Sequence, residues 1–184
     1  MIFPRFRRAP GGPDTISALY GMIVAQARLP CFYRDYGVAD TVNGRFDLIV
    51  LHLALVLDRL AQDPALRTLG QGIFDRFCQD MDHNLREMGI GDLKVPKEMQ
   101  RVGEAFYGRA QAYQAALAAA DRQVLVEAVA RNIYGGMPAA LGLAPRLAAY
   151  MRVAVGDLAS QASANLGAGR LSFPDPAAIP STPG

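Results

Sequence analysis

Residues 74–97 read FDRFCQDMDHNLREMGIGDLKVPK, and this stretch decides the fold class. Charged side chains recur at helical spacing up to Glu87, and Gly89 and Gly91 then interrupt the pattern before Pro96. Glycine is favoured just after the end of a helix, and proline is favoured in the first turn of one. The stretch therefore predicts a helix that ends at Gly89, a short turn, and a second helix that begins at Pro96.

Helical periods continue on both sides of this hairpin, and alternating strand patterns are scarce. A helix over residues 45–62 is apolar nearly all round, which is typical of a central, buried helix. Caps and helix stops mark the other helices. Asp14 is the expected N-cap of a helix over residues 15–28, and Asp63 with Pro64 opens a helix over residues 63–88. We expect three more helices: one over residues 96–120, one that Asp121 opens and that ends at Gly135–Gly136, and one over residues 145–165 that starts near Pro145. The aromatic connector 30–44 has room for one short helix. We predict an all-α, single domain of about six helices in an orthogonal or irregular bundle.

The length of 184 residues fits one domain with a sizeable core. We expect a flexible basic arm over residues 1–13, the helical domain over 14–166, and a flexible tail rich in proline and glycine over 167–184. The tail is either disordered or a loosely docked strap. Cys31 and Cys78 form no metal-binding or disulfide pattern, which favours free thiols in a reducing compartment.

The membrane and nucleic-acid signals are weak. The longest apolar run, residues 48–57, is too short to span a bilayer, and residues 1–10 lack the apolar stretch of a secretory signal. We expect a cytoplasmic protein, with peripheral contact at the cytoplasmic face of the inner membrane as a further option. The net charge of +2 gives no reason to expect DNA binding. Arg5, Arg7 and Arg8 form a short basic arm suited to anionic lipid or ribosomal RNA, although a frayed charged terminus is the simpler interpretation.

A metal site is the first chemical hypothesis for the hairpin. Asp80, His83 and Glu87 are spaced three and four residues apart, so they share one helix face. Carboxylate-bridged metal sites in helical bundles need a second helix with a matching histidine. The other histidine, His52, lies among leucines and is better explained as a core residue than as a haem ligand or proton relay. We therefore predict no metal, no cofactor and no catalytic residue, and a helical metal-dependent or quinone-related enzyme stays as the alternative.

Ion pairing is the second hypothesis for the same residues. Asp82 precedes Arg86 by four positions, the favourable order for a helical ion pair. The acidic side chains of this helix outnumber Arg86, which implies a basic partner from elsewhere in a buried network that fixes helix register. The candidates are Arg45, Arg109 and Arg131.

Nucleophilic and nucleotide chemistry have little support. No serine lies in a nucleophile-elbow pattern, and no glycine-rich phosphate loop is present. Cys78 falls in mid-helix, where a packed small apolar residue is the ordinary interpretation.

Several ordered strings resemble the ubiquinol–cytochrome c chaperone family. They cover about residues 14–134 and comprise ALY and IVAQAR (18–20, 23–28), FY (32–33), GVADT (37–41), GRFD (44–47), DMD (80–82), LREMGIGDL (85–93), VPK (95–97) and FYGR (106–109). The short N-terminus resembles the bacterial members rather than the mitochondrial ones.

This resemblance implies an assembly chaperone for the cytochrome bc1 complex (respiratory complex III) and not an enzyme. Mitochondrial relatives hold newly made cytochrome b near the ribosome, together with a small partner protein. The implied partners here are cytochrome b or another bc1 subunit, with a ribosome or a small partner protein as further options. A membrane- or ribosome-binding adaptor that uses the basic arm is the second alternative.

The aromatic connector and the hairpin are the candidate surfaces for binding a client or for holding the hairpin in shape. The residues are Phe32, Tyr33, Asp40, Arg45, Phe46, Asp80, Asp82, Arg86, Glu87, Gly89, Asp92, Lys97, Tyr107 and Arg109.

Overall fold

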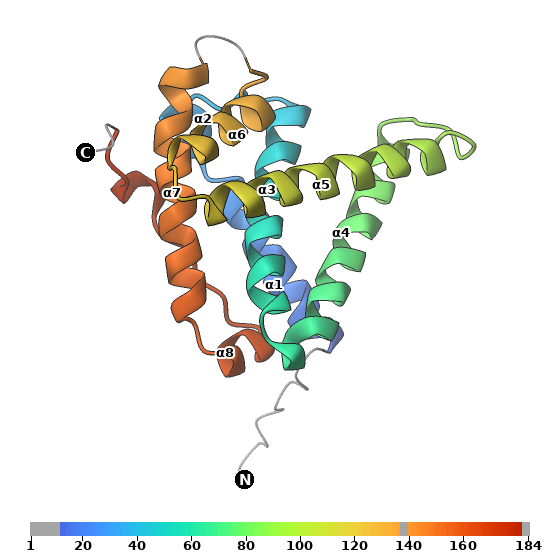
Figure 1. The fold of residues 1–184 in the computed structure, drawn as a ribbon. Coiled ribbons are helices and arrows are strands. Elements are labelled where there is room, and N and C mark those ends of the chain that lie inside the picture. Colours follow the sequence, from blue (N-terminus) through green and yellow to red (C-terminus); the bar gives the residue numbers. More distant parts are fainter. Residues whose placement is uncertain (1–11, 137–139, 182–184) are drawn as a thin grey trace.

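A computed structural model describes residues 12–136 and 140–181 (Figure 1). Six long helices carry the fold in these residues, which confirms the prediction of an all-α domain of about six helices. They are α1 (Pro13–Ala27), α3 (Val42–Ala61), α4 (Arg67–Glu87), α5 (Val95–Ala118), α6 (Gln123–Ile133) and α7 (Ala140–Ser160). The short elements are α2 (Pro30–Arg34), α8 (Ser163–Gly167) and the 3₁₀ turns η1 (Pro64–Leu66) and η2 (Pro176–Ala178).

Helix α3 is the centre of the domain (Figure 1). It contacts α1, α4, α5, α6 and α7, and every residue from Leu48 to Val56 is buried. A helix surrounded on all sides has no face that needs polar side chains, which explains why its middle is apolar all round. The prediction of a central helix is confirmed, although α3 begins at Val42 and not at Arg45.

The earlier start of α3 depends on a tight turn at its entrance. The Thr41 hydroxyl accepts a hydrogen bond from the Gly44 amide at 3.1 Å, which caps the helix. A Cβ atom at Gly44 would lie 1.9 Å from the backbone oxygen of Ala39. Only glycine therefore permits this approach of the connector to the first turn.

Three sequence-based helix starts need correction. Gly12 and not Asp14 is the N-cap of α1, because Pro13 takes the first helical position and Asp14 falls in the first turn. Asp63 does cap the next segment through the Ala65 amide, but a 3₁₀ turn precedes α4. Helix α7 includes Pro145 instead of starting near it. Proline has no backbone N–H group, so Pro145 cannot donate to the Leu141 carbonyl one turn earlier in the helix. Leu141 is exposed, so water can donate to this carbonyl instead.

Residues 170–181, named the strap here, follow α8 and return beside α7 (Figure 1). Side chains of α1, the connector and α7 donate hydrogen bonds to its backbone carbonyls: Gln26 to Pro174, Tyr36 to Pro176, and Arg146 to Ile179. The sequence allowed the tail to be either disordered or a loosely docked strap. These hydrogen bonds dock residues 170–181 more closely than the second alternative implied. The expected basic arm, residues 1–13, lies almost wholly outside the described residues, and its Pro13 is already part of α1.

His52 lies in an aromatic cluster beneath the strap. Its Nδ1 is 2.7 Å from the Leu48 carbonyl oxygen, so Nδ1 carries the proton and donates, and Nε2 accepts from the Tyr150 hydroxyl at 2.9 Å. The Phe173 ring of the strap packs edge-on against the imidazole. Complete burial lowers the pKa of His52 to about 4. This is the satisfied core histidine that the sequence favoured.

Candidate functional site

Helices α4 and α5 form the predicted hairpin, which projects from the body of the domain (Figure 1). Gly89 ends α4 with a φ of +83°, a left-handed conformation that glycine adopts without strain. Arg86 pairs with Asp82 at 2.7 Å and with Asp92 in the turn. The predicted Asp82–Arg86 pair is therefore confirmed, and it joins the helix to the turn that follows.

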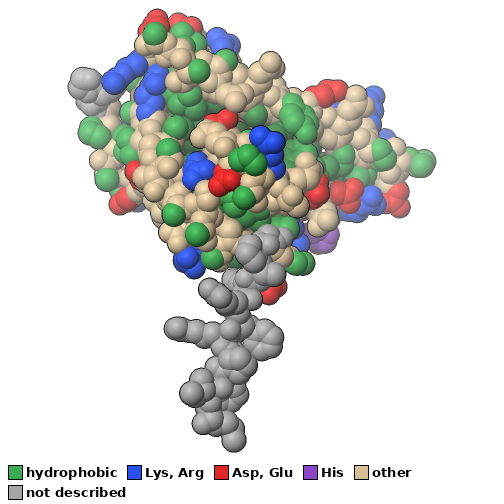
Figure 2. All heavy atoms as spheres, turned by 60° about the horizontal axis from the view of Figure 1, so that its bottom comes forward, with side chains coloured by type: hydrophobic (Ala, Val, Ile, Leu, Met, Phe, Trp, Pro, Cys, Tyr) green, Lys and Arg blue, Asp and Glu red, His purple; other side chains and the backbone are tan. Residues whose placement is uncertain are grey.

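The hairpin tip carries two large apolar side chains that are exposed to solvent. Leu93 is 98% exposed and Met88 is 56% exposed. Charged side chains of both signs lie among apolar ones on the projecting part of the molecule in Figure 2. Lys97 on α5 is also exposed. A single exposed leucine needs no explanation, but two large apolar residues at the end of a charged projection indicate a contact surface.

The three residues of the metal hypothesis have separate partners. Asp80 accepts a hydrogen bond from the Tyr20 hydroxyl at 2.9 Å, which directs it toward α1. His83 and Glu87 face each other at 3.3 Å on the exposed side of α4. No group of three or more histidine, cysteine or acidic side chains lies close enough to share a metal ion in residues 12–136 and 140–181.

The expected basic partners do not reach the hairpin acids, so that part of the prediction is wrong. Arg45 pairs with Asp40 in the connector, and Arg109 pairs with Asp47 of α3. Arg131 forms no ion pair among the residues that the structure describes. Asp82, Glu87 and Asp92 instead pair within the hairpin, and Asp80 binds the Tyr20 hydroxyl of α1.

One largely buried ion pair between helices does exist, and it joins Arg109 to an acid that the sequence did not identify. Arg109 Nη2 is 2.8 Å from Asp47 Oδ1 where α5 crosses α3, and the two side chains are only 23% and 12% exposed. The guanidinium also lies 5.8 Å from the centre of the Phe46 ring. Burial raises the pKa of Asp47, an effect that the neighbouring Arg109 reduces. This pair fixes the crossing of the two helices.

A shallow, mostly apolar groove of about 200 Å³ lies between α3, α4 and α5. Phe74 and Phe106 line it from α4 and α5, with ring centres 4.9 Å apart, and Leu57 lines it from α3. The Tyr107 side chain is exposed at its edge. Tyr107 is thus accessible to a partner, as expected for a binding residue.

The aromatic connector divides into buried and accessible residues. Phe32 is fully buried against Tyr150 and His52, so it holds the fold and cannot touch a client. Tyr33 is half-buried, and its hydroxyl donates to the Ala27 carbonyl at 2.8 Å. Asp40 and Arg45 are exposed.

Comparison with known proteins identifies the family. The model of the ubiquinol–cytochrome c chaperone family matches residues 34–173. The chain belongs to this family. The crystal structure of the Cbp3 homolog from Brucella abortus is similar to this chaperone with a TM-score of 0.82 and 39% sequence identity, over 92% of this chain and 94% of that one. No curated protein matches the sequence.

Family membership supports a chaperone role, in which the surface binds a client protein and no catalytic centre is required. No helix among the described residues of this chaperone is long and apolar enough to cross a membrane. Among the described residues, the hairpin tip, the groove beside Tyr107 and the exposed part of the connector are accessible parts of the candidate client surface. Leu93 and Met88 at the tip were not singled out as site residues, although an apolar residue inside a charged turn was a signal that could have found them.

Proposed function

We propose that this protein is an assembly chaperone for ubiquinol–cytochrome c reductase, and that it binds newly made cytochrome b or another subunit. The family match and the similarity to a Cbp3 homolog support this proposal. We place its action at the cytoplasmic face of the inner membrane, where a membrane-protein client becomes accessible. A ribosome or a small partner protein can join it there.

The observation that carries the proposal is the projecting hairpin with its exposed apolar tip. An assembly chaperone must contact apolar client surface and release it again, so its own contact surface has to remain soluble when empty. Ion pairs and charged side chains surround Leu93 and Met88, which meets this requirement. Asp82, Arg86, Asp92 and Gly89 then hold the tip in shape, while Tyr107 offers a second contact along the groove.

The proposal is tested by affinity capture of the tagged protein from detergent-solubilised membranes of the native organism. The wild-type protein should enrich cytochrome b or another bc1 subunit over an untagged control. The Met88→Ser/Leu93→Ser double variant should lose most of this enrichment. Val153→Ser on α7 is the matched control, since it removes an exposed apolar residue away from the hairpin and should change nothing.

Three results would count against the proposal. Absence of any bc1 subunit from the wild-type capture would remove the client. Equal capture by the wild-type protein and the double variant, with normal helical content in both, would move the contact surface away from the hairpin tip. A deletion strain with normal bc1 assembly and cytochrome b level would refute the role as a whole.

A further inference from the structure

A second hollow, of about 350 Å³, lies where α1 ends, α2 begins and the connector enters α3. Its lining is unusually rich in arginine and consists of Arg28, Pro30, Tyr33, Arg34, Asp40 and Arg45. Tyr33 forms an aromatic wall, because its hydroxyl is tied to the Ala27 carbonyl and the Arg45 guanidinium lies 5.9 Å from its ring centre. This hollow is separate from the hairpin tip and from the groove beside Tyr107.

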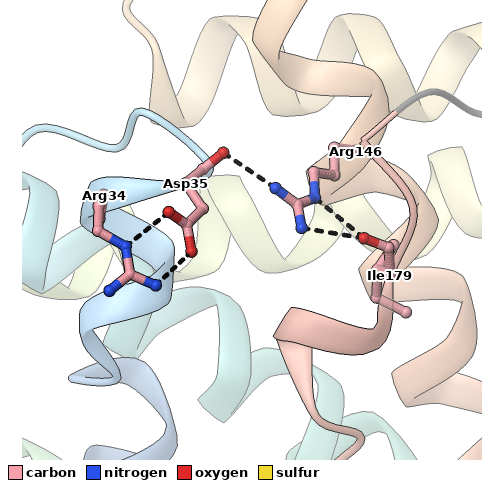
Figure 3. A network of polar contacts seen from close by, with 4 residues as sticks. All are labelled: Arg34, Asp35, Arg146 and Ile179. Carbon is pink, nitrogen blue, oxygen red and sulfur yellow. Dashed lines mark hydrogen bonds and ion pairs between the residues drawn. The ribbon is translucent and has the colours of Figure 1, made fainter.

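The three guanidinium groups keep free hydrogen-bond donors. The exposed Arg28 side chain makes no hydrogen bond or ion pair with the described residues. Arg45 binds Asp40 through Nε alone, at 2.7 Å, which leaves its two terminal nitrogens available. Arg34 uses Nε and Nη2 on the carboxylate of Asp35, and its other terminal nitrogen carries no contact in Figure 3.

The charge around the hollow is unbalanced in favour of the arginines. Asp40 and Asp35 each neutralise one guanidinium, Arg45 and Arg34 respectively, and Arg28 has no acidic partner among the described residues. Arg146 adds further positive charge on the other side of Asp35, where it donates to the Asp35 and Ile179 carbonyls (Figure 3). An anion in the hollow therefore enters a region of net positive potential.

We propose that this hollow binds the phosphate group of an anionic phospholipid. A carboxylate offers two oxygens and is satisfied by one guanidinium, whereas a phosphate group offers more acceptor oxygens and matches several arginines at once. The donors left free on Arg28, Arg34 and Arg45 fit the second case.

The neighbourhood of the hollow favours a lipid as the source of the phosphate. Val42, between Asp40 and Arg45 in the sequence, is 68% exposed, and Pro30 is exposed in the lining itself. Apolar side chains beside a basic hollow suit the interface of a bilayer, where headgroup and acyl chains meet. The choice of lipid over free phosphate rests on the proposed function, which places the protein beside a membrane-bound client.

The test is co-sedimentation of the full chain with vesicles. Vesicles of equal parts phosphatidylcholine and phosphatidylglycerol are compared with vesicles of phosphatidylcholine alone, and inorganic phosphate is titrated separately by calorimetry. We expect binding to the anionic vesicles only, weakening as salt is raised. Arg28→Gln should lower the partition coefficient about fivefold, and Arg28→Gln/Arg45→Gln about 25-fold, from the ~1 kcal/mol that one arginine contributes at an anionic surface.

Arg28→Gln is the decisive variant because the exposed Arg28 side chain makes no hydrogen bond or ion pair with the described residues, so a folding defect is not expected. Arg131→Gln is the control, since Arg131 is also exposed and without an ion pair among the described residues, but lies on α6. A third variant replaces Arg5, Arg7 and Arg8 with glutamine and measures the part of the binding due to the basic arm.

Each outcome decides the proposal. Equal vesicle binding by wild type, Arg28→Gln and the double variant would overturn it. Binding of inorganic phosphate without vesicle binding would keep the phosphate site and overturn the lipid source. Retention of an RNA oligonucleotide in place of vesicles would also overturn the lipid source. The vesicle assay contains no client, so its failure leaves the capture of cytochrome b as an independent result.

Discussion

The Asp47–Arg109 pair gives the sharpest stability prediction. Replacing Arg109 with leucine leaves the Asp47 carboxylate, 12% exposed, without its counter-charge between α3 and α5. Removing one partner of a buried ion pair costs about 3–5 kcal/mol, and the partial exposure of Arg109 favours the lower end, about 3 kcal/mol. For a domain of this size that corresponds to a fall in melting temperature of about 6–12 °C.

The assay is a double-mutant cycle measured by chemical denaturation. Asp47→Leu/Arg109→Leu removes both charges together and should lie within about 1 kcal/mol of the wild type, because buried pairs are often replaced by apolar residues with little loss. Since Arg109→Leu alone costs about 3 kcal/mol and the double variant about 1 kcal/mol or less, the coupling free energy should be at least about 2 kcal/mol, and larger by whatever Asp47→Leu costs alone. Arg101→Leu on the same helix is the control, since its pair with Glu98 is exposed and should contribute about 1 kcal/mol or less.

The effect of pH gives an independent check of the same pair. Burial raises the pKa of Asp47 in the folded state above its unfolded value, so folding favours the protonated carboxyl. The stability contribution of Asp47 is full at low pH and is lost as pH rises through the raised pKa. Arg109→Leu raises the pKa of Asp47 further, so the stability that this variant loses relative to the wild type should shrink as pH falls toward 4. The reasoning would be refuted if Arg109→Leu lost no more stability than Arg101→Leu. It would also be refuted if the losses of Asp47→Leu and Arg109→Leu simply added up in the double variant.

Three other predictions concern the fold. Gly44→Ala forces a Cβ atom against a backbone oxygen and should destabilise the protein by at least about 1 kcal/mol. Gly103→Ala in α5 has open space around the new Cβ atom and should stabilise the protein by about 0.5–1 kcal/mol. Urea denaturation midpoints measure both effects, and similar midpoints for the two variants would contradict the packing. His52 has a pKa of about 4 in the folded state, below its unfolded value of about 6.5. Its contribution to folding stability is therefore present above pH 6.5, and about 3 kcal/mol of that stability is lost as pH falls through 4. A His52→Gln variant whose stability falls equally steeply in acid would refute this. Tyr36→Phe removes a hydrogen-bond donor to the strap and should lower the free energy of unfolding by about 1–3 kcal/mol. Proteolysis within residues 170–181 should become faster. Unchanged cleavage would show that this hydrogen bond does not hold the strap.

The local elements of the fold could be predicted because local chemistry determines them. Gly89 marks the end of α4 through its left-handed conformation, and Asp63 caps the next segment through its own side chain. The Asp82–Arg86 pair follows from spacing on one helix. Each of these depends on residues within a few positions of one another, so the sequence pattern contains the whole interaction.

Interactions between distant segments could not be predicted in the same way. Asp47 was not recognised as the partner of Arg109, because the pair exists only where α3 and α5 cross. Phe32 was expected on a binding surface, but its exposure depends on how α2 packs against α3 and α7. The composition of the tail was consistent with both disorder and docking, and the donors that hold it come from distant segments of the chain.

The strap also affects the order in which the protein can reach its final structure. It follows every long helix along the chain, yet Phe173 packs on His52 in the central helix, and Gln26 near the end of α1 donates to Pro174. During synthesis the six long helices emerge before the segment that covers this side of their core. The native state of the chaperone is thus completed only after α7 and α8 have been made, so a C-terminal truncation that removes residues 170–181 would weaken the contacts of the first helix as well as those of the last.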